Sequence, residues 1–197
     1  MNQFDQFQHA LNLTKVSESV FSFTPDPKYF VGNTPHGGYL MALMNKALAS
    51  VMPHPSAINS NVYYLDRTDP AEAEIHIEIL RTSRGSSMGQ ARLIQNGKTT
   101  CLFSGLYSDF KYMKGHSGLG TPLPAIKDSL DEAQFKRMNY DTLKPGSTPS
   151  FIQQLELSVH PHHAWWDSAL PVGEAEARCS AYLELIGGPA NELVLSY

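Results

Sequence analysis

Apolar residues with helical spacing begin near residue 40 of the chain. Residues 33–48 read NTPHGGYLMALMNKAL, and the apolar positions recur at Leu40, Leu43, Met44, Ala47, Leu48 and Val51. Steps of three and four residues predict an amphipathic helix with one buried face. Thr34 and Pro35 are expected to cap its start, because threonine suits an N-cap and proline the first helical position. The sequence MPHPS at 52–56 should end it, since proline lacks a backbone donor.

The pattern changes to a period of two after this helix. Four alternating runs, separated by turn signals, cover residues 57–65, 71–80, 86–95 and 98–108. In the second run the apolar residues Ala73, Ile75, Ile77 and Ile79 face away from Glu74, His76 and Glu78. This alternation is typical of half-buried antiparallel strands. Asn96-Gly97 predicts a tight type I′ hairpin between the last two runs. A short opening strand is expected within residues 17–24, followed by a loop.

The second half of the chain divides into two stretches. Residues 110–150 lose periodicity and are rich in Gly, Pro, Ser and charge, which indicates a linker. Alternation resumes at 150–161 and 174–185, and GGPANELVLSY at 187–197 matches a helix start. The expected organisation is therefore an N-terminal domain (1–109), a linker (110–150) and a partial second domain (151–197).

Composition and charge exclude several classes of partner. Of the 197 residues, 42% are hydrophobic and 10% aromatic, enough to bury a core. The formal net charge is -4, and Lys and Arg are scattered along the chain, so no basic patch for nucleic acid or an anionic membrane is expected. No signal peptide is recognised in MNQFDQFQHALNLTKV, and no apolar run reaches the roughly eighteen residues of a membrane span. A cytoplasmic protein is expected.

Neither the cysteines nor the histidine cluster predicts a metal or redox site. Cys101 and Cys179 lie in strand-like runs, where a thiol usually serves as a small buried hydrophobe. The sequence HPHHAWWD at 160–167 offers three imidazoles without a convincing carboxylate or thiolate ligand. The paired Trp165 and Trp166 are interpreted as covering a sheet edge, an inter-domain surface or a pocket mouth. No metal and no cofactor are expected.

Three segments of the chain carry a family resemblance. They are GNTPHGGYLMALMNKAL (32–48), NVYYLDR (61–67) and LRTSRGSSMGQARLIQNGK (80–98). In this order they are similar to the double-hotdog acyl-CoA thioesterases of the thioesterase II type. The resemblance runs through residues 18–109 and weakly resumes at 150. It implies an α+β hotdog fold, an antiparallel sheet wrapped around a central helix, followed by an incomplete second hotdog repeat.

The resemblance implies an acyl-CoA substrate and a site at the helix start. Thioester hydrolysis needs hydrogen-bond donors for the developing oxyanion, and the first amides of a helix have no intrahelical partner. Gly37 and Gly38 would offer these amides because they have no Cβ to keep the substrate away. His36 and Tyr39 are assigned to the substrate pocket. The alternative is that the glycines only allow close packing of helix against sheet, and that His36 only begins the helix.

The water-activating base is expected outside the chain. In the family the base is an Asp of the second hotdog, where it acts with a Gln and a Thr or Ser. If NELVLSY matches the start of the second helix, this Asp would follow shortly after Tyr197. Asp66 is a weaker candidate within the chain, since a strand-end Asp is more often a solvated turn residue. The family also reads Leu-Arg-Pro where this chain has Leu65-Asp66-Arg67, which displaces a basic group by one position.

Three functions therefore remain open at this point. The first is an acyl-CoA thioesterase, active once the second hotdog is complete. The second is a non-catalytic acyl-thioester binding or assembly module, because the expected Asp is missing. The third, a hotdog dehydratase, is disfavoured because no His with a partner carboxylate is found where such chemistry needs it. Hotdog domains would pair across a continuous sheet, so a homo-oligomer is expected.

Overall fold

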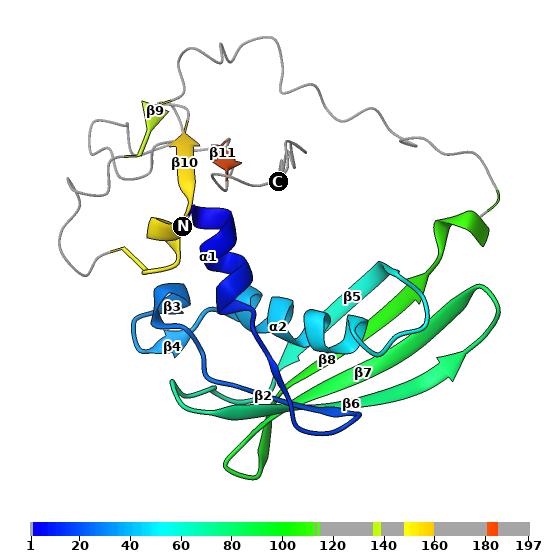
Figure 1. Ribbon diagram of the computed structural model, residues 1–197. Helices are drawn as coiled ribbons and strands as arrows, with labels where there is room; N and C mark the ends of the chain where they lie inside the picture. Colours follow the sequence, from blue (N-terminus) through cyan, green and yellow to red (C-terminus); the bar gives the residue numbers. More distant parts are fainter. Residues whose placement is uncertain (1, 113, 115–135, 139–147, 160–180, 185–197) are drawn as a thin grey trace, which may run out of the picture. The chain divides into compact units, whose positions relative to one another are not determined.

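A six-stranded antiparallel sheet wraps around one long helix in the first part of the chain (Figure 1). The structure, a computed structural model, describes residues 2–112, 114, 136–138, 148–159 and 181–184. The chain divides into two units, one of Gln6–Gly115 and one of Met1–Asp5 with His116–Tyr197. Each unit is described by itself.

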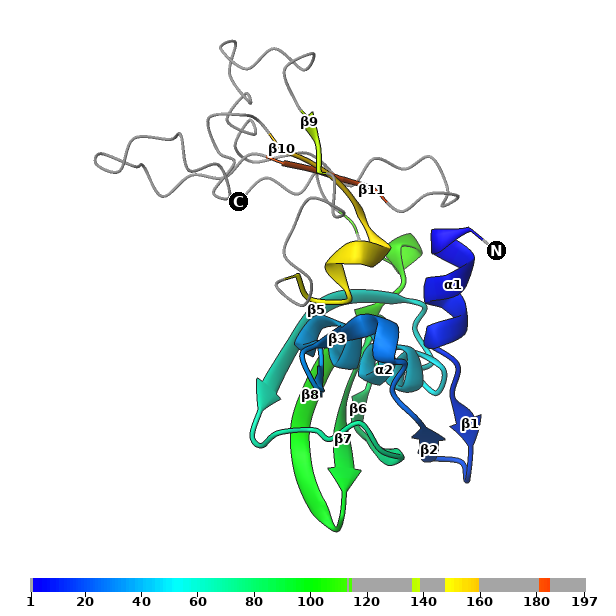
Figure 2. The same ribbon diagram turned by 90° about the vertical axis from the view of Figure 1, so that its left-hand side faces the viewer.

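The first unit holds most of the regular structure. Its elements in chain order are α1 (Gln3–Ala10), β1 (Thr14–Lys15), β2 (Val20–Phe23), the 3-10 helix η1 (Pro27–Tyr29), β3 (Phe30–Val31), β4 (Thr34–Pro35), α2 (Gly37–Ala49), β5 (Ser56–Tyr64), β6 (Ala73–Thr82), β7 (Ser86–Gln95), β8 (Lys98–Ser108) and the 3-10 helix η2 (Phe110–Tyr112). The large sheet has the order β1-β2-β6-β7-β8-β5, and β3 and β4 form a separate two-stranded ladder. Strands β1 and β5 therefore lie at opposite edges (Figure 2).

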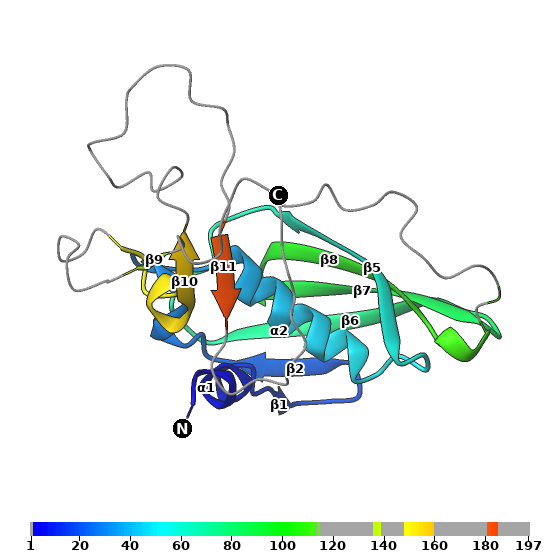
Figure 3. The same ribbon diagram turned by 90° about the horizontal axis from the view of Figure 1, so that it is seen from above.

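Helix α2 packs lengthwise on the concave side of the sheet (Figures 1 and 3). The predicted apolar stripe is its buried face, and Leu43, Met44, Ala47 and Leu48 are completely buried. The sheet meets them with side chains that are equally inaccessible: Ile75, Ala91, Leu93, Cys101 and Phe103. Each fully buried Leu or Phe side chain stabilises the fold by about 1.5–3 kcal/mol relative to an exposed one.

Two facing glycines bring α2 close to the sheet. Gly89 of β7 is paired with Gly105 of β8. A Cβ on Gly89 would lie 2.9 Å from Leu48 Cδ1, and a Cβ on Gly105 would lie 3.3 Å from Leu48 Cδ2. Met52 Cε would lie 2.6 Å from the Cβ on Gly89 and Tyr107 Cε2 would lie 2.7 Å from the Cβ on Gly105, so these two side chains and Leu48 together occupy the space that the missing methyl groups leave.

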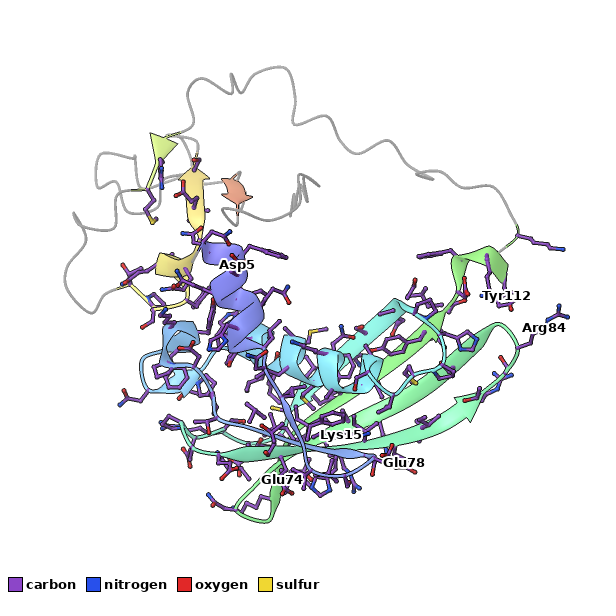
Figure 4. The ribbon with its side chains drawn as sticks, in the orientation of Figure 1. Asp5, Lys15, Glu74, Glu78, Arg84 and Tyr112 are labelled. Atoms are coloured by element: carbon purple, nitrogen blue, oxygen red, sulfur yellow. The ribbon has the colours of Figure 1, made fainter. Side chains whose placement is uncertain are left out.

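The opposite face of the sheet is polar, as the alternation predicts. Glu74 accepts a hydrogen bond from His76 Nε2 at 2.7 Å, and Gln90 donates to Glu78 at 2.7 Å. Figure 4 shows Glu74 and Glu78 on the side of the sheet away from α2. The four predicted strands of this sheet and the Asn96-Gly97 hairpin are confirmed. Asn96 and Gly97 have φ values of 51° and 74°, the left-handed geometry that a type I′ turn requires.

Several local predictions are wrong. Helix α1 was not predicted, and the loop expected before α2 contains η1 and the β3–β4 ladder. Thr34 and Pro35 belong to β4, and the N-cap of α2 is His36, in an extended conformation. Val51 lies after the end of α2. Within residues 25–36, the pairing of β3 with β4 replaces the loop and the helix cap that the composition suggested.

The second unit contains a short antiparallel sheet. Its strands are β9 (Lys136–Arg137), β10 (Glu156–Val159) and β11 (Ala181–Glu184), in the order β11-β10-β9. A 3-10 helix, η5 (Ile152–Gln154), replaces the first part of the strand expected from residue 150. Arg137 and Glu156 form an ion pair between β9 and β10. Among the described residues, no helix is both long and apolar enough to cross a membrane.

Candidate functional site

The first turn of α2 presents free amide groups. His36, the N-cap, has extended φ and ψ of -63° and 136°, and its side chain does not cap the helix. Its backbone N–H donates to Tyr29 O at 2.8 Å, and its carbonyl accepts from Leu40 N at 3.1 Å. Within the described residues the N–H groups of Gly37 and Gly38 have no hydrogen-bond acceptor. Two donors and the positive end of the helix dipole therefore coincide at the predicted oxyanion position.

Aromatic rings fill the space beside the two glycines. A Cβ on Gly37 would lie 2.8 Å from both Cζ and the hydroxyl oxygen of Tyr64. A Cβ on Gly38 would lie 3.1 Å from Cε1 of His36. Gly37 therefore accommodates a ring from β5 and Gly38 a ring from the N-cap residue, and the choice between substrate access and close packing stays open. The backbone amides, which do not depend on the Cβ direction, stay unpaired.

His36 is a half-buried imidazole at this helix start. Burial lowers the pKa of His36 below its ordinary value, because desolvation disfavours the charged form. The ring is therefore neutral at pH 7, when it can donate one hydrogen bond and accept another. The neutral ring can make the predicted contact with a carbonyl oxygen or a leaving thiol, and the assignment to a substrate pocket stays a prediction.

Tyr39 is held firmly from two directions. Its side chain is only 3% exposed, and its hydroxyl donates to Ala10 O at 2.8 Å and accepts from Asp26 N at 3.1 Å. Its ring stacks on that of Tyr29, with the centroids 5.1 Å apart. Burial raises the pKa of Tyr39. These contacts attach α1 and the 26–29 segment to the first turn of α2, so Tyr39 helps to fix the position of that turn; contact with a substrate stays a prediction.

Asp66 follows β5 and is half-exposed. Its Oδ1 accepts from the backbone N–H of Arg67 at 2.8 Å, and its Oδ2 lies 3.8 Å from Lys98 Nζ. Arg67 in turn donates to Asn33 O at 3.4 Å, which places this guanidinium beside the residues that precede α2. The displaced basic group noted in the sequence therefore lies near the start of α2, and a role in the site stays a prediction. The catalytic assignment of Asp66 stays untested.

Three other side chains that could react, His54, Ser87 and Cys101, are buried in the first unit. His54 Nδ1 lies 3.0 Å from Ser87 Oγ and its Nε2 lies 3.3 Å from Arg84 O. Since a carbonyl only accepts, Nε2 carries the proton and Ser87 donates to Nδ1. Ser87 is 1% exposed, so this pair anchors a loop and offers no accessible nucleophile. Burial raises the pKa of Cys101, which keeps its thiol protonated and unreactive.

The remaining candidates lie outside the described residues. These are the histidines and tryptophans of 160–167, Cys179 and the helix start expected near Tyr197. In the part of the chain that the structure describes, no three His, Cys, Asp or Glu side chains are grouped as metal ligands.

The architecture defines the class of protein. The arrangement of sheet and helix is similar to that of a conserved protein of unknown function with hot dog fold from Alicyclobacillus acidocaldarius, with a TM-score of 0.62 and 18% identity over 78% of this chain and 55% of the other. A proposed thioesterase II from Thermobifida fusca YX gives a TM-score of 0.66 and 20% identity over 80% of this chain and 55% of that protein. Acyl-CoA thioesterase II TesB2 from Mycobacterium marinum gives a TM-score of 0.57 and 11% identity, over 91% of this chain and 60% of that protein. The predicted hotdog fold is confirmed.

The family match identifies the first unit more closely. Residues 24–108 match the family described as the acyl-CoA thioesterase N-terminal domain. The resemblance to a hotdog acyl-CoA thioesterase is therefore confirmed over this segment, which contains α2 and all of β5 to β8. The chain spans only 55% of the length of the Thermobifida and Alicyclobacillus proteins. Among curated proteins, none matches the chain.

Sequence reasoning missed two features of the helix start. The ring of Tyr64 against Gly37 was not foreseen, although the alternation of β5 places this side chain on the same face as Val62. The hydrogen bond from Arg67 to Asn33 was also missed, because it joins segments that are distant in the sequence.

Proposed function

We propose that this protein acts on acyl-CoA thioesters and hydrolyses them to the free acid and CoA. The observation that carries the proposal is the pair of amides at Gly37 and Gly38, which have no hydrogen-bond acceptor among the described residues, inside a segment that matches the acyl-CoA thioesterase N-terminal domain. The acyl chain length and the physiological substrate are not part of the proposal.

In the proposed reaction the described residues stabilise the negative charge that develops on the carbonyl oxygen. A base takes one proton from water as the water oxygen adds to the thioester carbon, the carbonyl electrons move to oxygen, and the amides of Gly37 and Gly38 stabilise the resulting oxyanion. Collapse of the tetrahedral species reforms the carbonyl and breaks the bond to sulfur, and the departing thiolate takes up a proton. Neutral His36 is our candidate for a hydrogen bond to the carbonyl or the thiol. Asp66 is the base candidate within the chain.

The β5 edge supports a proposal about assembly. In the sheet order β5 is terminal, and most of its residues are exposed, including Ile58 at 40% and Tyr63 at 55%. An exposed strand edge with apolar side chains invites further pairing. We propose that a second hotdog extends the sheet at this edge, so that the protein forms an oligomer of hotdog units.

Thiol release from a panel of acyl-CoAs tests the enzymatic proposal. The wild-type chain should release CoA thiol, and Asp66→Asn should reduce the rate strongly if Asp66 is the base. Glu72→Gln, a change in an exposed carboxylate directly before β6, is the matched control and should leave the rate unchanged. Binding of a non-hydrolysable thioether analogue without any thiol release would contradict the hydrolase and favour the acyl-thioester binding module. Absence of both would contradict either function.

A further inference from the structure

Tyr64 is the last residue of β5 and faces the helix. It is paired with Cys101 of β8, whose side chain is fully buried beneath α2. Cross-strand partners lie on the same face of a sheet. The preceding residue, Tyr63, is paired with Leu102 and lies on the opposite face. The side chains of the two adjacent tyrosines therefore point to opposite faces of the sheet. Their exposure is similar, 52% for Tyr64 and 55% for Tyr63.

The phenol of Tyr64 reaches the first residue of α2. Its Cζ and hydroxyl oxygen both lie 2.8 Å from the position that a Cβ of Gly37 would take. No side chain larger than hydrogen fits there without movement of the ring. The hydroxyl group is thus placed beside Gly37, the first of the two glycines whose backbone amides begin α2.

The hydroxyl of Tyr64 is available to a ligand. In the described part of the chain it has no hydrogen-bond partner, and half of the side chain is open to solvent. Partial burial, and then the nearby Cys101, raise the pKa of Tyr64 above its ordinary value. The group is therefore an O–H donor throughout the physiological range.

We propose that the Tyr64 hydroxyl is a third donor to the thioester carbonyl oxygen, next to the Gly37 and Gly38 amides. This inference rests on the function proposed above and extends it to a residue on a different element. As the carbonyl oxygen becomes negatively charged, the O–H···O contact becomes charge-assisted and strengthens. Tyr64 therefore stabilises the transition state more than the bound substrate, and its effect is expected in kcat.

Tyr64→Phe removes the hydroxyl and keeps the ring against Gly37. It should lower kcat for acyl-CoA hydrolysis about three- to tenfold, with little change in KM, as expected for one hydrogen bond lost from the transition state. Tyr63→Phe removes the same group from the other face and should keep the wild-type kcat. A purely structural role of Tyr64 would change neither value, because the ring remains.

A double-mutant cycle joins Tyr64 to Gly37. Gly37→Ala places a methyl group where the phenol lies, and the half-exposed ring can move away. If this movement withdraws the hydroxyl, Gly37→Ala should reduce kcat in the wild-type background and have a smaller effect in the Tyr64→Phe background. Equal effects in both backgrounds would contradict the coupling.

The outcomes separate the inference from the proposed function. Wild-type hydrolysis with an unchanged kcat in Tyr64→Phe would overturn the role of Tyr64 and leave the hydrolase intact. A wild-type chain that neither hydrolyses acyl-CoA nor binds its thioether analogue would overturn both. A reduced kcat in Tyr64→Phe, with normal Tyr63→Phe, would support the inference.

Discussion

At the scale of single residues, Tyr107 shows how burial controls ionisation. Its side chain is 1% exposed, and its hydroxyl donates to Asn45 Oδ1 at 2.7 Å. Burial raises the pKa of Tyr107 to about 12. A tyrosine in the unfolded chain titrates near pH 10. The neutral phenol therefore stabilises the fold fully below about pH 10, and this contribution is lost as the pH rises toward about 12.

We predict that the free energy of unfolding falls between about pH 10 and about pH 12, and that Tyr107→Phe weakens this dependence. The substitution itself should cost about 1 kcal/mol at neutral pH, because one buried hydrogen bond is lost. Urea unfolding at several alkaline pH values, with tyrosinate absorbance as a second signal, measures both effects. Tyr63→Phe, at an exposed position, is the control. Ionisation of every tyrosine near pH 10 in the folded protein would contradict the prediction.

The sequence predicts residues well where a period governs them. The buried face of α2 follows from the spacing of Leu40, Leu43 and Met44, and the two faces of β6 begin as its alternation indicates. It does not predict contacts that depend on tertiary distance. Tyr64 reaches Gly37 across 27 residues of chain, and no local pattern contains that information. The N-cap was misassigned to Thr34 for a different, local reason, because this residue pairs with Val31 in the β3–β4 ladder and the helix begins after His36.

At the scale of elements, the packing of α2 on the sheet depends on small residues opposite Leu48. A Cβ on Gly89 would approach Met52 Cε to 2.6 Å, Leu48 Cδ1 to 2.9 Å and the carbonyl oxygen of Glu78 to 3.1 Å. The end of the Met52 side chain can move, but Leu48 is fully buried and the Glu78 oxygen belongs to the backbone of β6. The methyl group must therefore separate helix and strand or force a strained side chain.

We predict that Gly89→Ala destabilises the protein by about 1–3 kcal/mol, the usual cost of overpacking a core. Urea unfolding of the variant and the wild type measures this difference. Gly85→Ala is the matched control, because its added methyl group would meet only Tyr112 Cβ, at 3.9 Å. Its stability should stay within about 0.5 kcal/mol of the wild type. Equal stability of Gly89→Ala and wild type would show that α2 does not pack as described.

The sequence predicted the long, regular helices and strands better than the short ones. The four alternating runs became β5 to β8, because each has enough residues to make its period evident. Short elements such as β3, β4 and η1 have two or three residues and no period at all. Helix α1 has a mixed surface and only Ala10 is buried in it, so its apolar pattern is weak.

At the scale of the whole molecule, the β5 edge determines how hotdog units would assemble. Its exposed apolar residue Ile58 offers a position at which a charge would oppose strand pairing. We predict that the wild-type protein is an oligomer in solution and that Ile58→Lys lowers the molar mass of the assembly. Light scattering after size-exclusion chromatography measures this mass. Val16→Lys, at a similarly exposed valine next to β1, places the same charge at the opposite edge and should leave the mass unchanged. A monodisperse wild-type monomer would contradict the pairing.

The fold class could be predicted from the order of the helices and strands. The candidate site at the start of α2 could be predicted only in part. The strand, helix and four-strand order indicates a hotdog before any contact is known, whereas the organisation of residues 110–197 depends on segments beyond those described. Gly37 and Gly38 were identified from the physics of helix ends, since any first turn has free amides. The rings that surround them come from other elements and required the structure.

The central claim is that the thioester carbonyl binds at the amides that begin α2. Nuclear magnetic resonance of the chain labelled with ¹⁵N-glycine, titrated with a non-hydrolysable acyl-CoA thioether ketone analogue, tests it most directly. The account predicts that the amide signals of Gly37 and Gly38 shift on saturation, while Gly32 and Gly97, in turns with positive φ, stay in place. Saturable binding with unchanged Gly37 and Gly38 signals would contradict it.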